Sequence, residues 1–164
     1  MWRFLERAWL TYFHLASFGL FTFIAIHVHE KRKIDALLYA NLVLIIGALI
    51  YATINTWFVN VTWRDNQSLY NFLGNITAAL WVARVGFAHI SLMLLIKNKL
   101  LQVQYCLNAT VALLVITYPF FILAIFANNV GEGLTRFIIA LSILSAFGTV
   151  ATPLMSKLTK ITGK

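Results

Sequence analysis

Acidic side chains are absent from every long hydrophobic stretch of this sequence. The five Asp and Glu residues all lie outside those stretches. Transport through an intramembrane carboxylate relay is therefore disfavoured, because such relays need Asp or Glu at membrane depth. The sequence also has no phosphate-binding glycine loop and no nucleophile with a nearby base, so it contains no catalytic motif.

Cysteine, proline and charge are also scarce. Cys106 is the only cysteine, which excludes an intrachain disulfide and a thiolate metal site. No carboxylate lies at ligand spacing beside the four histidines, so we predict no metal site. Charged residues make up 11% of the chain and hydrophobic residues 61%, which is the composition of a membrane protein. Little chain is left for a catalytic domain outside the membrane, and we expect the protein not to be an enzyme on its own.

Five apolar stretches, each of about 20 residues or more, fill most of the chain. A helix of this length crosses the hydrocarbon core, and it satisfies its own backbone hydrogen bonds there. The sequence therefore predicts an all-α integral membrane protein, a single domain over residues 1–164 built as a bundle of about five transmembrane helices. The predicted spans are residues 10–28, 36–59, 69–96, 103–127 and 136–155.

Basic residues give the chain a net charge of +8 and lie in short clusters beside the hydrophobic runs. This pattern indicates membrane topology and contact with anionic lipid, so we expect no nucleic-acid partner. If all five spans cross, eight basic residues lie on one side and four on the other, with Arg84 left out. The positive-inside rule then predicts the N-terminus outside and the C-terminus inside. We expect a multi-pass protein of a plasma membrane, a cell inner membrane or an organellar inner membrane.

Arg84 is the strongest candidate functional residue, because it lies deep in the third span, about 18 Å from the nearer end. A guanidinium in hydrocarbon costs roughly 2.5 to 3.5 kcal/mol on insertion scales, so it needs a compensating group. The candidates are backbone carbonyls, water, an anionic ligand or cofactor, a lipid phosphate, or a carboxylate of another subunit. Trp81 lies one turn earlier on the same polar stripe, and we expect both side chains to make helix–helix or subunit contacts.

The histidines allow a second interpretation, a b-type haem held by two imidazoles from different helices at similar depth. His89 of the third span can meet His27 or His29, near the inner end of the first span, if the helices tilt. Arg84 or Arg32 would then lie near the haem propionates. Otherwise His27 and His29 form a polar helix end, and His89 makes an interhelical hydrogen bond.

Small and hydroxyl-bearing residues on two other spans indicate close helix packing. Asn41 and Asn55 share one face of the second span, and Ser142 and Ser145 share a stripe of the last span beside Gly148. Membrane helices approach closely and hydrogen-bond through such residues. We expect these side chains in helix–helix or subunit interfaces, although a polar conduit would use the same residue types.

Together these patterns favour a non-catalytic structural or accessory membrane subunit of a larger respiratory, photosynthetic or transport complex. This function explains the uncompensated Arg84 and the near absence of chain outside the membrane. Two alternatives stay open. One is a haem-binding membrane anchor in quinone-linked electron transfer, and the other is a small channel or transporter with Arg84 as an intramembrane anion site.

Overall fold

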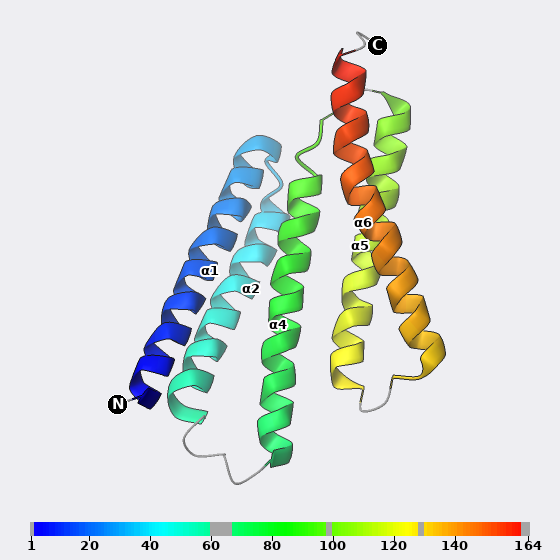
Figure 1. Cartoon of the computed structure of the whole chain (residues 1–164). Coiled ribbons are helices and arrows are strands. Elements are labelled where there is room, and N and C mark those ends of the chain that lie inside the picture. The colour runs from blue at the N-terminus through cyan, green and yellow to red at the C-terminus, as the bar shows by residue number, and fades with distance from the viewer. Residues whose placement is uncertain (1, 60–66, 98–99, 128–129, 162–164) are drawn as a thin grey trace. The chain divides into compact units, whose positions relative to one another are not determined.

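The computed structural model describes residues 2–59, 67–97, 100–127 and 130–161. In these ranges all regular structure is helical, and five helices are long and apolar enough to span a membrane (Figure 1). The number and type of the predicted spans are therefore confirmed. The helices are α1 (Trp2–Arg32), α2 (Asp35–Ile54), α4 (Gln67–Met93), α5 (Leu101–Phe126) and α6 (Glu132–Ile161), and a π-helical segment η1 (Asn55–Val59) continues α2.

Three of the helices are longer than the apolar stretches that predict them. α1 begins at Trp2 rather than near residue 10, and α6 ends at Ile161 rather than near residue 155. Helical hydrogen bonds continue into the polar flanks, whereas hydropathy detects only the part that fits the hydrocarbon. Two α-helices are shorter: α4 ends at Met93, before the predicted residue 96, and α2 ends at Ile54, where η1 continues it to the predicted residue 59. The orientation of the termini across the membrane stays a prediction.

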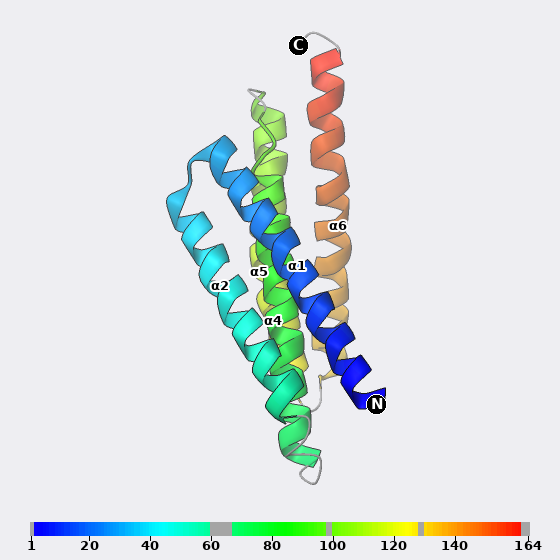
Figure 2. The same ribbon diagram turned by 90° about the vertical axis from the view of Figure 1, so that its left-hand side faces the viewer.

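The chain divides into two compact units, residues 1–88 and 89–164. The first unit contains α1, α2 and most of α4, and the second contains the end of α4 with α5 and α6. Consecutive helices within each unit run in opposite directions (Figure 1, Figure 2). The interpretation of residues 1–164 as a single membrane domain stays a prediction.

A tight turn reverses the chain between α1 and α2. Lys33 has a φ of 56°, the left-handed conformation that ends many helices, and its N–H donates to the His29 carbonyl at 2.7 Å. Asp35 then begins α2, where a carboxylate interacts favourably with the helix dipole. Only Lys33 and Ile34 separate the two helices, and this short connection makes α1 and α2 antiparallel neighbours in the first unit.

Polar side chains also join the helices of the first unit. The Tyr51 hydroxyl donates to the Leu73 carbonyl of α4 at 2.9 Å, and the Asn55 amide donates to the Thr77 hydroxyl at 3.3 Å. The Trp57 indole in η1 donates to the Thr11 hydroxyl of α1 at 3.0 Å. Each of these bonds satisfies a polar group that lipid would otherwise leave without a partner.

Close contact between α5 and α6 holds the second unit together. The hydroxyls of Thr110 and Thr152 lie 3.2 Å apart, and those of Thr117 and Ser145 lie 3.0 Å apart. Gly148 faces Thr110, and a Cβ atom at Gly148 would lie only 3.0 Å from the Thr110 Cγ2. The helices therefore approach closely because glycine leaves room for a threonine, as small residues do in membrane interfaces.

Large hydrophobic side chains cover the outside of the helices, while several hydroxyls and one guanidinium lie inside. Trp9 on α1 is 70% exposed and Phe147 on α6 is 73% exposed, whereas Arg84 is 2% exposed and Thr152 fully buried. A water-soluble protein rarely exposes large contiguous apolar patches. This distribution, together with the five apolar helices, indicates a multi-pass membrane protein.

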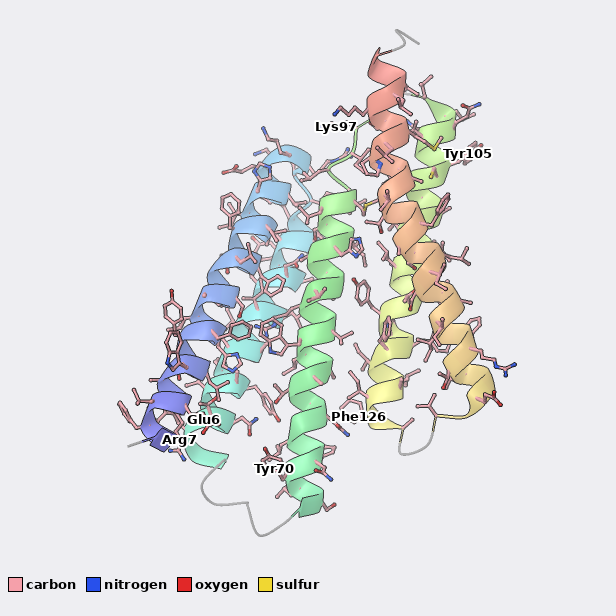
Figure 3. All side chains as sticks on the ribbon, viewed as in Figure 1. Glu6, Arg7, Tyr70, Lys97, Tyr105 and Phe126 are labelled. Carbon is pink, nitrogen blue, oxygen red and sulfur yellow. The ribbon has the colours of Figure 1, made fainter. Side chains whose placement is uncertain are left out.

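Charged and aromatic side chains lie at the helix ends (Figure 3). Glu6 and Arg7 of α1 and Tyr70 of α4 lie at the same end of the first unit. In the second unit, Lys97 and Tyr105 lie at one end and Phe126 at the other. Aromatic and charged residues at span ends are typical of the membrane–water interface.

Candidate functional site

Arg84 lies in an aromatic cluster inside the first unit. Its guanidinium carbon is 4.2 Å from the ring centroid of Trp81 and 5.6 Å from that of Phe21 on α1. Trp81 precedes Arg84 by three residues on α4, so one helical turn brings the indole and the guanidinium onto the same face. A cation over an indole is attracted by its ring quadrupole, by up to about 2 kcal/mol when both are desolvated.

The guanidinium nevertheless has donors without acceptors. Arg84 Nε and Nη1 are buried and have no hydrogen-bond partner among the described residues. The ion pairs found in the described ranges join His29 to Asp35 and Arg136 to Glu132, all at helix ends. The aromatic rings offset part of the cost of burying Arg84, but they supply neither a negative charge nor an acceptor in the plane of these N–H groups.

His14 of α1 lies beside the same indole. The His14 and Trp81 ring centroids are 6.3 Å apart, and Phe13 stacks on Trp81 with a centroid separation of 5.3 Å. His14 is 8% exposed, and its Nδ1 is buried without a hydrogen-bond partner. The residues around Trp81 therefore combine a buried cation with a second polar nitrogen that lacks a partner among the described residues.

Sequence reasoning does not select His14, because no other histidine lies at its depth. The signal lies in the helical period, since His14 and Phe21 are seven residues apart and share one face of α1. Phe21 contacts Arg84 and His14 contacts Trp81, so this face packs on the polar stripe of α4. His14 can be identified from the sequence if the polar stripe of α4 is matched with a face of α1.

His89 belongs to the second unit and uses both ring nitrogens. Its Nδ1 lies 2.9 Å from the Tyr118 hydroxyl of α5, and its Nε2 lies 3.0 Å from the Thr149 hydroxyl of α6. The Thr149 hydroxyl also lies 2.7 Å from the Ser145 carbonyl oxygen of its own helix. Both ring nitrogens of His89 therefore have a hydroxyl partner, one on α5 and one on α6, whichever nitrogen carries the proton.

This network bears on the haem interpretation. A haem iron needs an imidazole lone pair, and both ring nitrogens of His89 are already engaged by the Tyr118 and Thr149 hydroxyls. In the first unit, His27 stacks on Phe23 with ring centroids 6.0 Å apart, and His29 Nδ1 lies 3.5 Å from an Asp35 carboxylate oxygen. Haem ligation would have to break the His89 network, and it stays a prediction that a reduced-minus-oxidised visible spectrum tests.

The other predicted contact residues fall into two groups. Asn55 bonds to Thr77 of α4 and Ser145 bonds to Thr117 of α5, so both connect helices. Asn41 donates to the Leu37 carbonyl and Ser142 to the Ile138 carbonyl, each within its own helix. Asn41 is 4% exposed, which places it in the interior of the first unit. Within the described ranges, no three His, Cys, Asp or Glu side chains lie close enough to hold a metal ion.

The hydrogen bond between His89 and Tyr118 predicts that substitutions at these two residues have coupled effects on stability. We expect Tyr118→Phe and His89→Leu each to lower the free energy of unfolding by about 0.5–1.5 kcal/mol, since each leaves a buried polar group unpaired. The double variant should cost less than the sum of the two single variants, because both remove the same bond. A double-mutant cycle of detergent unfolding measures this coupling, and strictly additive costs would refute the bond.

The fold and these two clusters define the class as a multi-pass helical membrane protein with a buried guanidinium. Comparisons with protein-family models, curated proteins and solved structures found no match for the chain.

Proposed function

We propose that the protein is a non-catalytic membrane subunit of a larger membrane assembly, and that an acidic side chain from a partner helix completes Arg84. The observation that carries the proposal is the buried guanidinium whose Nε and Nη1 have no acceptor among the described residues. The spans of this chain contain no Asp or Glu within their apolar stretches. The negative charge that balances Arg84 therefore has to come from another molecule.

A carboxylate compensates the buried Arg84 guanidinium better than neutral acceptors do. The effective cost of burying an ion is several kcal/mol, while the cation–π contact with Trp81 returns on the order of 2 kcal/mol. Carbonyls or water would satisfy the N–H groups without neutralising the charge. A carboxylate does both, and its hydrogen bonds to Arg are about twice as strong as neutral ones.

The surface of α1 offers a place for the partner helix. Leu5, Ala8, Trp9 and Tyr12 line an apolar groove of about 380 Å³ along one face of α1. One residue further along, Phe13 is 57% exposed and stacks on Trp81, which contacts Arg84. The Arg84 cluster thus lies one aromatic layer below the surface of α1.

Co-purification tests the proposal. We expect Arg84→Ala to reduce the yield of partner subunits at least about tenfold, because removing one member of a buried charge pair costs roughly 2–5 kcal/mol. The measurement is quantitative mass spectrometry of subunits retained by the tagged protein after extraction from its native membrane in mild detergent. Arg136→Ala is the matched control, since the Arg136 side chain is 77% exposed and pairs only with Glu132 one turn away. Equal partner yields from wild type and Arg84→Ala would exclude the proposal.

A second function, a small channel or transporter for anions, is favoured by one observation. Two nitrogens of Arg84 lack partners beside the Trp81 ring, and a small anion can accept from several donors at once. Chloride flux into liposomes containing the purified protein, lost in Arg84→Ala, would support this function over the structural subunit. Partner retention that is lost in Arg84→Ala, with no chloride flux, would support the structural subunit.

A further inference from the structure

A second basic site lies in the second unit and shares no residue with the Arg84 cluster. Six residues line a pocket of about 270 Å³ between the segment that follows α4 and the last turns of α6: Leu95, Ile96, Lys97, Pro153, Ser156 and Lys157. Pro153, Ser156 and Lys157 are spaced three and four residues apart, so they share one face of α6. The pocket is therefore built by two separate segments of the chain.

The lining combines positive charge with an apolar floor. Lys97 and Lys157 bring two ammonium groups and Ser156 a hydroxyl, while Leu95, Ile96 and Pro153 bring aliphatic surface. Among the described residues that line the pocket there is no carboxylate. Two cations and a hydroxyl suit a phosphate, and the adjoining aliphatic surface suits a group that continues into hydrocarbon.

The position of the pocket matches the depth of lipid headgroups. Lys97 follows the end of α4, and Figure 3 shows it at one end of the second unit. Lys157 lies beyond the predicted apolar span that ends at residue 155. Lysines at span ends extend their ammonium groups into the interface, where phosphates are concentrated.

We propose that this pocket binds the phosphate of an anionic phospholipid, with Lys97 and Lys157 on the phosphate and the Leu95, Ile96 and Pro153 surface against the start of the acyl chains. The site is independent of the Arg84 cluster and of the proposed assembly. A free phosphate shares the charge but would leave the apolar floor unused, so the lipid is the occupant that satisfies the whole lining.

Native mass spectrometry of the full chain in mild detergent tests the site, with short-chain phosphatidylglycerol and phosphatidylcholine as probes. We expect preferential binding of phosphatidylglycerol. We expect the Lys97→Gln/Lys157→Gln variant to weaken this binding roughly 5- to 30-fold, since each lysine near the surface contributes on the order of 1 kcal/mol toward anionic lipid. Lys31→Gln/Lys33→Gln is the matched control, because it removes the same charge from the turn between α1 and α2 and should leave the affinity unchanged.

Two further measurements separate the possible outcomes. Raising the salt to about 1 M shortens the Debye length to about 3 Å and should weaken phosphatidylglycerol binding to the unmodified protein. A large excess of inorganic phosphate should not displace the lipid. Equal affinity for the two lipids, equal losses in the two double variants, or displacement by inorganic phosphate would each overturn the lipid assignment.

Discussion

Replacing Arg84 by methionine is expected to stabilise the isolated protein, raising its free energy of unfolding in detergent by about 0.5–1.5 kcal/mol. A guanidinium at this depth costs roughly 2.5 to 3.5 kcal/mol, and the Trp81 contact at 4.2 Å returns up to about 2 kcal/mol. Methionine keeps much of the volume and removes the charge, and replacing buried charges by hydrophobic groups is often stabilising. The measurement is reversible unfolding followed by circular dichroism, with the protein separated from its partners.

The same substitution should have the opposite effect on the assembly, because it removes the only described guanidinium that lies inside the first unit. Arg136→Met is the control and should change the free energy of unfolding by less than about 0.5 kcal/mol, since its side chain is exposed. A loss of stability in Arg84→Met would show that Arg84 is compensated within this chain. The proposal of an external carboxylate would then fail.

Gly148→Ala is expected to lower the free energy of unfolding by about 1–3 kcal/mol, in spite of the better helix propensity of alanine. The added Cβ would lie 3.0 Å from the Thr110 Cγ2 and 3.1 Å from its Cβ, and closer still to its hydroxyl oxygen. Thr110 is 2% exposed and bonds to Thr152, so it has little space in which to move. α5 and α6 would have to separate, which also lengthens the hydroxyl pairs between them.

Thermal unfolding of the variant in detergent measures this cost, with Gly47→Ala as the matched control. A Cβ at Gly47 meets nothing within 4 Å, so that substitution should be neutral or stabilising by up to about 1 kcal/mol. Combining Gly148→Ala with Thr110→Ala should recover part of the loss, because it removes the two Thr110 atoms nearest the new methyl group. Equal stabilities of the two alanine variants would contradict the close approach of α5 and α6.

Most of the fold is predictable because every residue of a span contributes to its mean hydropathy, which identifies the span as a whole. The five helices agree with the predicted stretches, and their ends differ because polar flanks continue a helix without adding to its hydropathy. The single-residue roles are harder to predict. Asn55 and Ser145 bond to other helices whereas Ser142 bonds to its own, although all three are small polar residues on apolar helices.

The sequence by itself determined that this is a helical protein with five potential membrane spans and with an arginine deep inside one of them. Both properties follow from the composition of a single helix. A membrane-spanning helix has to be long enough to cross the hydrocarbon core, and a charged side chain inside that core is costly. Only the tertiary structure decided which side chains meet. His14, Phe21 and Trp81 lie around Arg84, and the two ring nitrogens of His89 form hydrogen bonds with Tyr118 and Thr149. These contacts join segments far apart in the chain, and their distances depend on helix packing, which no periodicity within one segment records.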